Sequence, residues 1–135
     1  MSTDNVIHIA AAIIEDREGR VLLVRKKNTA YFMQPGGKPE PGESAPSALI
    51  RELKEELQIS VAAESLAFVG RFTDVAANEA NHRLVADIYR ITAPVGDIFP
   101  AAEIEEIIWL SPDAGDERLL APLTKNQILP LVKHG

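Results

Sequence analysis

The chain has 135 residues, the usual size of one compact domain. Hydrophobic residues make up 46% of it and charged residues 25%, which is typical of globular proteins and argues against a disordered or fibrous chain. Acidic residues outnumber basic ones by 20 to 14, and the resulting net charge of −6 argues against a general nucleic-acid binder, which needs a basic surface.

The first half of the chain opens with two apolar segments that predict strands. Val6 to Ile14 is rich in β-branched residues, and a polar, glycine-containing turn at 16–20 separates it from Val21 to Arg25. This order of segments predicts a β-hairpin. Further strands are predicted later in the chain, at 66–73, 83–91 and 104–110.

Helical periodicity indicates two helices, at 45–57 and at about 124–132, the second weakened by Pro130. Ser44 is placed to cap the first helix, and Pro46 lies in its first turn, where a missing N–H is harmless. The segment before this helix is rich in glycine and proline, so a loop is expected to lead into it. With no linker or repeat, the pattern is that of a mixed α/β single domain.

A helical wheel of the first helix shows where its carboxylates lie. The apolar stripe consists of Ala45, Leu49, Leu53 and Leu57. Glu56 falls within this stripe, and Glu52 and Glu55 lie beside it. Like charges one helical turn apart repel, and a buried unpaired charge is costly, so a cation is expected among them.

Carboxylate oxygens that leave open positions for phosphates suit Mg²⁺ or Mn²⁺. The alternative is a solvated face of a glutamate-rich helix, with part of its charge neutralised by Arg51 and Lys54. The position of Glu56 on the apolar stripe weakens that alternative without deciding the matter.

The spacing of residues 37–59 resembles the Nudix box of the Nudix hydrolases, the MutT-like family. The matching positions are Gly37, Glu43, Arg51, Glu52, Glu55 and Glu56. Gln58 departs from the pattern, because the family usually has glycine there, and glycine suits a left-handed residue that ends a helix. The approach at 32–37 and the acid-rich stretch before Trp109 also look like the family.

The resemblance implies a single Nudix domain over 1–135, an α/β/α sandwich around a mixed β-sheet. It implies that Glu52, Glu55 and Glu56 are catalytic metal ligands and that the backbone carbonyl of Gly36 adds another. Glu52 is alternatively the group that orients or deprotonates the attacking water. Glu43 and Arg51 are expected to form a structural pair that ties the loop to the helix, through a bidentate contact.

Residues outside the box complete the expected site. Glu103 resembles the remote acid that some family members bring to the metals, and Glu105 and Glu106 compete for that role. Arg25 and Lys26, at the end of the second predicted strand, are candidates for contact with phosphate or base, or else a solvated strand end. The family often reads the base from later segments, which here points to 119–126.

The implied activity is Mg²⁺- or Mn²⁺-dependent hydrolysis of a nucleoside triphosphate, or an oxidised relative of one, to a monophosphate and pyrophosphate. The alternatives are a nucleotide-sugar hydrolase of the ADP-ribose type, a dinucleoside-polyphosphate hydrolase, and a nucleotide-binding module without catalysis, for which Gln58 is the only hint. The expected partner is a small nucleotide, without nucleic acid or membrane; the sequence specifies neither the base nor the oligomeric state.

The cellular setting is predicted from two absences. The chain has no cysteine, which excludes disulfide bonds, thiolate zinc sites and thiol nucleophiles and suits a reducing cytoplasm. Its amino terminus lacks the basic region of a secretory signal, and the apolar run that follows it, Ile9 to Ile14, is only six residues long. We therefore expect a cytoplasmic protein.

Overall fold

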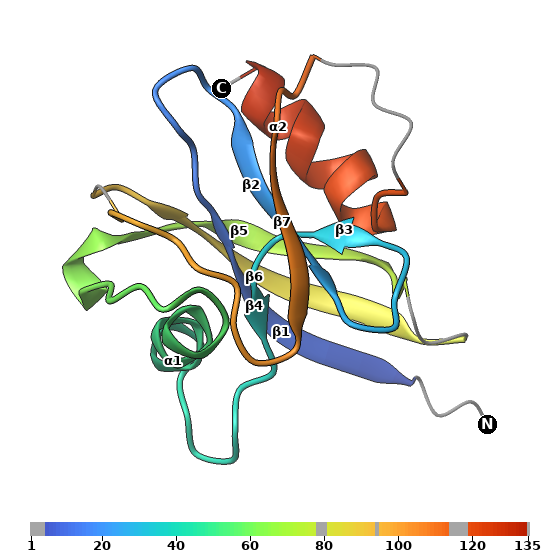
Figure 1. The fold of residues 1–135 in the computed structure, drawn as a ribbon. Helices are drawn as coiled ribbons and strands as arrows, with labels where there is room; N and C mark the ends of the chain where they lie inside the picture. Colours follow the sequence, from blue (N-terminus) through green and yellow to red (C-terminus); the bar gives the residue numbers. More distant parts are fainter. Residues whose placement is uncertain (1–4, 78–80, 94, 114–118, 135) are drawn as a thin grey trace.

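The computed structural model describes residues 5–77, 81–93, 95–113 and 119–134 of the chain. Within them, strands are sandwiched between two helical segments that lie on opposite sides (Figure 1). The elements in chain order are β1 (Val6–Ile13), β2 (Val21–Lys26), β3 (Phe32–Met33), β4 (Gly36–Gly37), α1 (Ala45–Leu57), η1 (Ala63–Ser65), β5 (Leu66–Val75), β6 (Arg83–Ile91), β7 (Ile104–Leu110), η2 (Thr124–Ile128) and α2 (Leu129–His134).

The described strands form two sheets. One has the order β4-β1-β6-β5, in which β1 and β6 run parallel and the other neighbours antiparallel. The second is antiparallel, with the order β3-β2-β7. The predicted α/β sandwich is confirmed, and so are the predicted ranges of α1, β6 and β7; β5 runs two residues beyond its predicted end at Thr73.

The predicted β-hairpin is wrong. β1 and β2 meet only next to their turn, where Glu15 bridges Val21 and Leu22 N–H donates to Ile14 O at 2.9 Å; beyond it each joins a different sheet. The reason lies in their composition, because both strands carry unbroken apolar runs rather than alternating ones. Such runs bury both faces of a strand, which suits the interior of a sandwich and not a hairpin with one wet face.

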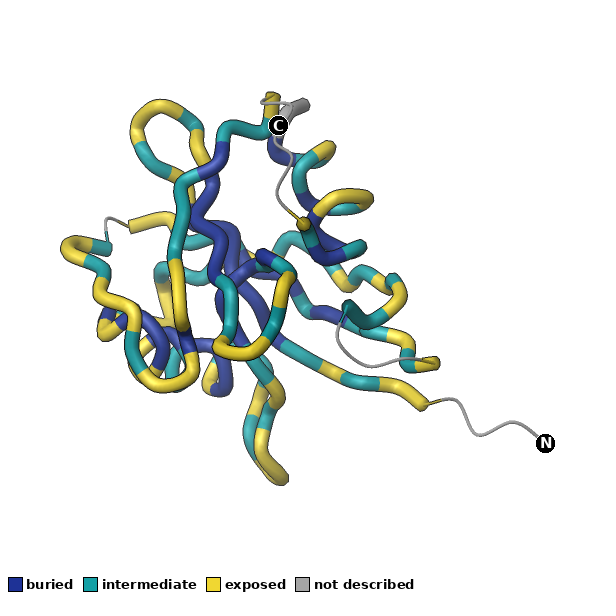
Figure 2. The backbone as a smooth tube through the Cα atoms, turned by 45° about the vertical axis from the view of Figure 1, so that its right-hand side comes forward, coloured by how far each residue is buried: buried dark blue, intermediate teal, exposed yellow. Residues whose placement is uncertain are grey.

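Alternate residues of β1 and β2 face opposite helices, which gives two cores. Ala10, Ala12, Ile14, Leu22 and Val24 pack with Leu49, Leu53 and Leu57 of α1. Ala11, Ile13, Val21 and Leu23 pack with Leu123, Ile128 and Val132 of the second helical segment. Figure 2 shows the buried chain running through the middle of the molecule, between these helices. β1 and β2 therefore hold both helical segments in place around the site described below.

The second predicted helix is present, but it begins as a π-helical turn and runs two residues beyond its predicted end at 132. Pro130 does not end it, because residues 124–128 form a wide π-helical turn in which Leu129 N–H donates to Thr124 O, five residues back. A π-turn moves the preceding carbonyls away from the proline ring, which would clash in a regular α-helix. In the described residues, no helix is both long and apolar enough to cross a membrane.

Candidate active site

Helix α1 begins and ends as its sequence predicts, and this fixes the direction of its glutamates. Ser44 Oγ accepts a hydrogen bond from Ser47 N–H at 3.2 Å, and the helix ends at Gln58, which is left-handed with φ 59°. Between these ends, Glu56 lies on the buried face with only 2% of its surface exposed. The wheel-based placement of Glu56 among the leucines is therefore confirmed.

The Glu56 carboxylate is held against the strand that precedes the box. Gly36 N–H donates to Oε1 of Glu56 at 3.3 Å, while Oε2 is buried without a hydrogen-bond partner. Burial raises the pKa of Glu56 to about 8, with repulsion from Glu52 acting in the same direction and Lys26 opposing both. An oxygen that is buried and unpartnered is costly unless a cation or donor reaches it.

Glu52 lies one turn earlier on α1, directly against β4. A Cβ atom added at Gly37 would collide with the Glu52 carboxylate, so only glycine allows this close approach. Burial raises the pKa of Glu52, and the attraction of Arg51 partly offsets that effect. β4 and α1 thus pack so closely that Glu52 and Glu56 both face the backbone of Gly36 and Gly37.

Arg51 and Glu43 form the bidentate contact that was expected. Nε and Nη2 of Arg51 donate to the two oxygens of Glu43, each at 2.9 Å, and Nη2 also donates to Lys38 O at 3.2 Å. Hydrogen bonds from Arg51 lower the pKa of Glu43 to about 2. The pair ties the loop between β4 and α1 to the second turn of the helix.

Glu55 and Glu103 complete one acidic cavity with Glu52 and Glu56. Its lining consists of Glu52, Glu55, Glu56, Ala102 and Glu103. Glu55 is half-exposed and its Oε1 accepts from Arg51 Nη1 at 3.0 Å. Within the described residues, no three acidic or histidine side chains are gathered tightly enough to hold an ion as they stand. The donor chemistry nevertheless fits a hard divalent cation, since Glu56, with its orphaned Oε2, lines the same cavity as three other carboxylates.

Backbone contacts bring Glu103 to this cavity. Ala101 N–H donates to Glu56 O at 2.8 Å, and Lys27 N–H donates to Glu103 O at 2.8 Å, so the segment before β7 is held between α1 and β2. Its competitors lie elsewhere, because Glu106 pairs with Arg25 and Glu105 is exposed and lines neither this cavity nor the second one described below. Of the three candidate acids, the structure brings only Glu103 to the cluster.

The two basic candidates on β2, Arg25 and Lys26, point in different directions. Lys26 Nζ pairs with Glu103 Oε1 at 3.3 Å and faces the site. Arg25 points away, donates to Thr29 O at 2.9 Å, and lines neither cavity. Successive side chains of a strand leave opposite faces, which explains the split. The geometry favours a structural role for Arg25 over substrate contact.

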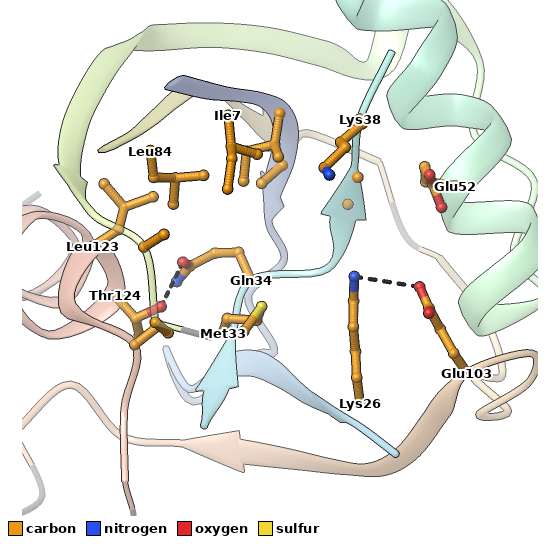
Figure 3. Close-up of a pocket in the computed structure, with 17 residues that line it drawn as sticks. Ile7, Lys26, Met33, Gln34, Lys38, Glu52, Leu84, Glu103, Leu123 and Thr124 are labelled. Carbon is orange, nitrogen blue, oxygen red and sulfur yellow. Dashed lines mark hydrogen bonds and ion pairs between the residues drawn. The ribbon is translucent and has the colours of Figure 1, made fainter. Parts of the chain in front are cut away.

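A second cavity of about 390 Å³ opens beside the acidic cluster and is mostly apolar. Figure 3 shows Lys26, Lys38, Glu52 and Glu103 at one end and Leu84, Leu123, Gln34 and Thr124 at the other. The second end is formed because the chain at 119–121 pairs with β3: Phe32 N–H donates to Leu119 O, and Ala121 N–H to Phe32 O, each at 2.9 Å. The segment 119–126, expected to read the base, thus supplies part of this wall.

Lys38 and Gln34 were not predicted from the sequence as site residues, and Thr124 was predicted only as part of the segment 119–126. Lys38 directly follows the paired glycines, which is a signal for a residue near the site. Gln34 gave no such signal, because its contact with Thr124 joins residues that are 90 positions apart in the chain.

The chain is similar to known proteins in sequence and in fold. A family model described as NUDIX domain matches residues 7–132. CTP pyrophosphohydrolase from Escherichia coli (strain K12) is 32% identical over 121 residues, covering 87% of this chain and 84% of that protein. ADP-ribose pyrophosphatase from Methanocaldococcus jannaschii is 35% identical over 65 residues, covering 44% of this chain and 38% of that protein. The crystal structure of the MutT protein from Methanosarcina mazei Go1 shares the fold, with a TM-score of 0.79 at 22% identity over 99% of this chain and 97% of that chain.

Proposed function

The chain belongs to the Nudix family of hydrolases, and from this premise we propose that it is a Mg²⁺-dependent pyrophosphohydrolase of nucleoside triphosphates. Its products would be a nucleoside monophosphate and pyrophosphate. The observation that carries the proposal is the cavity in Figure 3, which joins an apolar end to an end lined by carboxylates and lysines. A nucleotide has the same polarity, with a flat base at one end and a charged phosphate chain at the other.

Glu52, Glu55, Glu56 and the carbonyl of Gly36 are the proposed metal-holding groups, with Glu103 at the edge of the cluster. A bound divalent cation would neutralise phosphate charge and lower the pKa of a water molecule. Glu56 is held in place by Gly36 N–H and by the packing of α1, so its free oxygen is fixed in direction. Glu55 would have to leave Arg51 to take part.

The lysines are the proposed phosphate contacts. Lys26 and Lys38 both line the cavity between the apolar end and the glutamates, where a polyphosphate would lie. Lys26 now pairs with Glu103, so substrate binding would exchange a carboxylate partner for a phosphate one. As an alternative to holding the metal, Glu52, packed against Gly37, is the group that would orient the attacking water or accept its proton.

CTP is the first substrate to test, because the relative matched over most of both chains is named a CTP pyrophosphohydrolase. The full panel contains the ribonucleoside and deoxyribonucleoside triphosphates, 8-oxo-dGTP, a dinucleoside polyphosphate and ADP-ribose, each with Mg²⁺ and with Mn²⁺. Monophosphate and pyrophosphate from a triphosphate would support the proposal. Turnover of ADP-ribose alone would favour the nucleotide-sugar alternative, and binding without any product would favour a non-catalytic module.

A pair of matched variants links turnover to the cluster. Glu55→Gln keeps the size of the side chain and removes its charge, and we expect the rate to fall by about 100-fold or more. Glu64→Gln makes the same change at an exposed position in η1, outside both cavities, and should leave the rate unchanged. Circular dichroism should show both variants folded. Unchanged turnover in Glu55→Gln would overturn the assignment of the site.

A further inference from the structure

The apolar end of the cavity contains one buried amide whose hydrogen bonds are only half satisfied. Gln34 is 5% exposed, and its Oε1 accepts a hydrogen bond from Thr124 Oγ1 at 2.8 Å. Its Nε2 atom is buried without a hydrogen-bond partner. Leaving such a donor unpaired in an apolar setting costs free energy, so the structure is set up for an acceptor that the described protein residues do not supply.

The position of this amide tells where the acceptor would come from. Gln34 and Thr124 both line the cavity, at the end away from Lys26, Glu52 and Glu103 (Figure 3). Their neighbours there are apolar, including Leu84 and Leu123. A nucleotide with its phosphates among the charged groups would place its base at this end, which offers flat apolar contact and one polar donor.

Thr124 holds the oxygen end of the Gln34 amide. It is fully buried at the start of the π-helical turn, a departure from regular helix that is frequent at functional sites. Because its hydroxyl donates to Oε1, the NH₂ group is the unpartnered end of a side chain that lines the cavity. The opposite orientation would give Nε2 to the hydroxyl and turn an acceptor toward the ligand.

We propose that Gln34 reads the substrate by donating a hydrogen bond to an acceptor atom of its base, a ring nitrogen or an exocyclic carbonyl oxygen, and that Thr124 is the positioning residue that orients the amide. This inference rests on the proposed function for the placing of the phosphates. It adds a specificity-determining residue outside the box of glutamates.

Binding measured by NMR tests the proposal separately from turnover. The side-chain NH₂ signals of Gln34 in ¹⁵N-labelled protein are identified by their loss in Gln34→Met. The protein is then titrated with AMP, CMP, GMP and UMP, and with ribose 5-phosphate, which has no base. We expect at least one nucleotide to shift these signals and ribose 5-phosphate to leave them in place. If no nucleotide shifts them more than ribose 5-phosphate does, the proposal is wrong, even if the protein hydrolyses CTP.

Variants distinguish a donor from an acceptor. Gln34→Met removes both groups and Gln34→Glu retains only acceptors, so each should weaken binding of the responsive nucleotide by about 10-fold and leave ribose 5-phosphate binding unchanged. Gln127→Met makes the matched change on η2, outside this cavity, and should have no effect. Retained nucleotide affinity in Gln34→Glu would overturn the assignment of a donor.

The role of Thr124 has its own test. Thr124→Val keeps the shape and removes the hydroxyl, so we expect the base-dependent shift of the Gln34 signals to be lost and KM to rise with little change in kcat. Thr124→Ser restores the hydroxyl and should restore both. Thr73→Val, on the exposed strand β5, is the matched control. A Thr124→Ser variant that behaves as Thr124→Val does would overturn the positioning role.

Discussion

Gly36 N–H donates to Oε1 of Glu56 across 3.3 Å, and this contact leaves the other carboxylate oxygen of Glu56 buried without a partner. The hydrogen bond fixes the carboxylate against β4 but does not compensate fully for its removal from water. The pKa of Glu56 is accordingly raised to about 8, and burial is the main cause. In the absence of a cation, a residue that we propose as a metal ligand is therefore also a source of instability.

The first prediction concerns Glu56→Gln in the presence of a chelator. The pKa of Glu56 is raised from 4.5 to about 8 on folding, so its favourable contribution is fully present below pH 4.5 and is lost as the pH rises through 8. The glutamine variant does not titrate, and it should match the wild type near pH 5 and exceed its stability by a few kcal/mol near pH 9.

Denaturant unfolding at a series of pH values measures this difference, with Glu64→Gln as an exposed control that should follow the wild type. Mg²⁺-dependent turnover of Glu56→Gln should be lost at every pH. A variant that is less stable than the wild type at pH 9 would contradict the account of Glu56 as a buried, uncompensated charge.

Glu103→Gln and Glu105→Gln form the second prediction. Glu103 lines both cavities, whereas Glu105 lies two residues further along, exposed and outside both. We expect Glu103→Gln to raise the Mg²⁺ concentration needed for half-maximal turnover by about 10-fold, as is typical for groups next to metal ligands. Glu105→Gln should reach half-maximal turnover at the same Mg²⁺ concentration as the wild type. Equal effects of the two changes would mean that charge alone, and not position, matters.

The third prediction is that Gly37→Ala displaces Glu52 without unfolding the protein. The added Cβ would meet the carboxylate of Glu52, so the side chain must move away from β4. Turnover should fall by about 10-fold or more while the melting temperature changes little. Gly19→Ala gives the reverse pattern, because Gly19 has φ +77° in an open turn, and a side chain there strains the backbone without touching the site.

The fourth prediction uses acid to test the Arg51–Glu43 pair. The pKa of Glu43 is lowered from 4.5 to about 2, so its contribution to stability is present above pH 4.5 and is lost as the pH falls toward 2. The stability difference between wild type and Glu43→Gln should therefore be largest above pH 5 and shrink below it. Unfolding titrations from pH 7 to pH 3 measure it. A difference that stays constant across that range would show that Glu43 is not held as an ion pair.

These residues also show what could be predicted from sequence. Glu56 could be placed on a buried face because helical periodicity is local and needs only the residues of α1. The pairing of β1 could not, since an apolar run indicates burial on both faces and not which strand lies alongside. The contact of Gln34 with Thr124 depends on the pairing of the chain at 119–121 with β3, a tertiary arrangement that no short motif encodes.

The last prediction is that Gln58→Gly stabilises the protein. Gln58 ends α1 in the left-handed region, with φ 59° and ψ 33°, and its N–H donates to Lys54 O at 3.1 Å while Ile59 N–H reaches Leu53 O at 3.5 Å. This is the helix end that glycine favours, because a Cβ atom is strained there. The greater freedom of glycine in the unfolded chain offsets part of the gain, so we expect about 0.5 to 1 kcal/mol of added stability and a rise of roughly 2 to 4 °C in Tm. Ser60→Gly, which introduces glycine two residues later at an exposed position, should lower Tm slightly. Differential scanning calorimetry of the two variants measures both changes, and a Tm for Gln58→Gly at or below that of the wild type would show that the helix end carries no relievable strain.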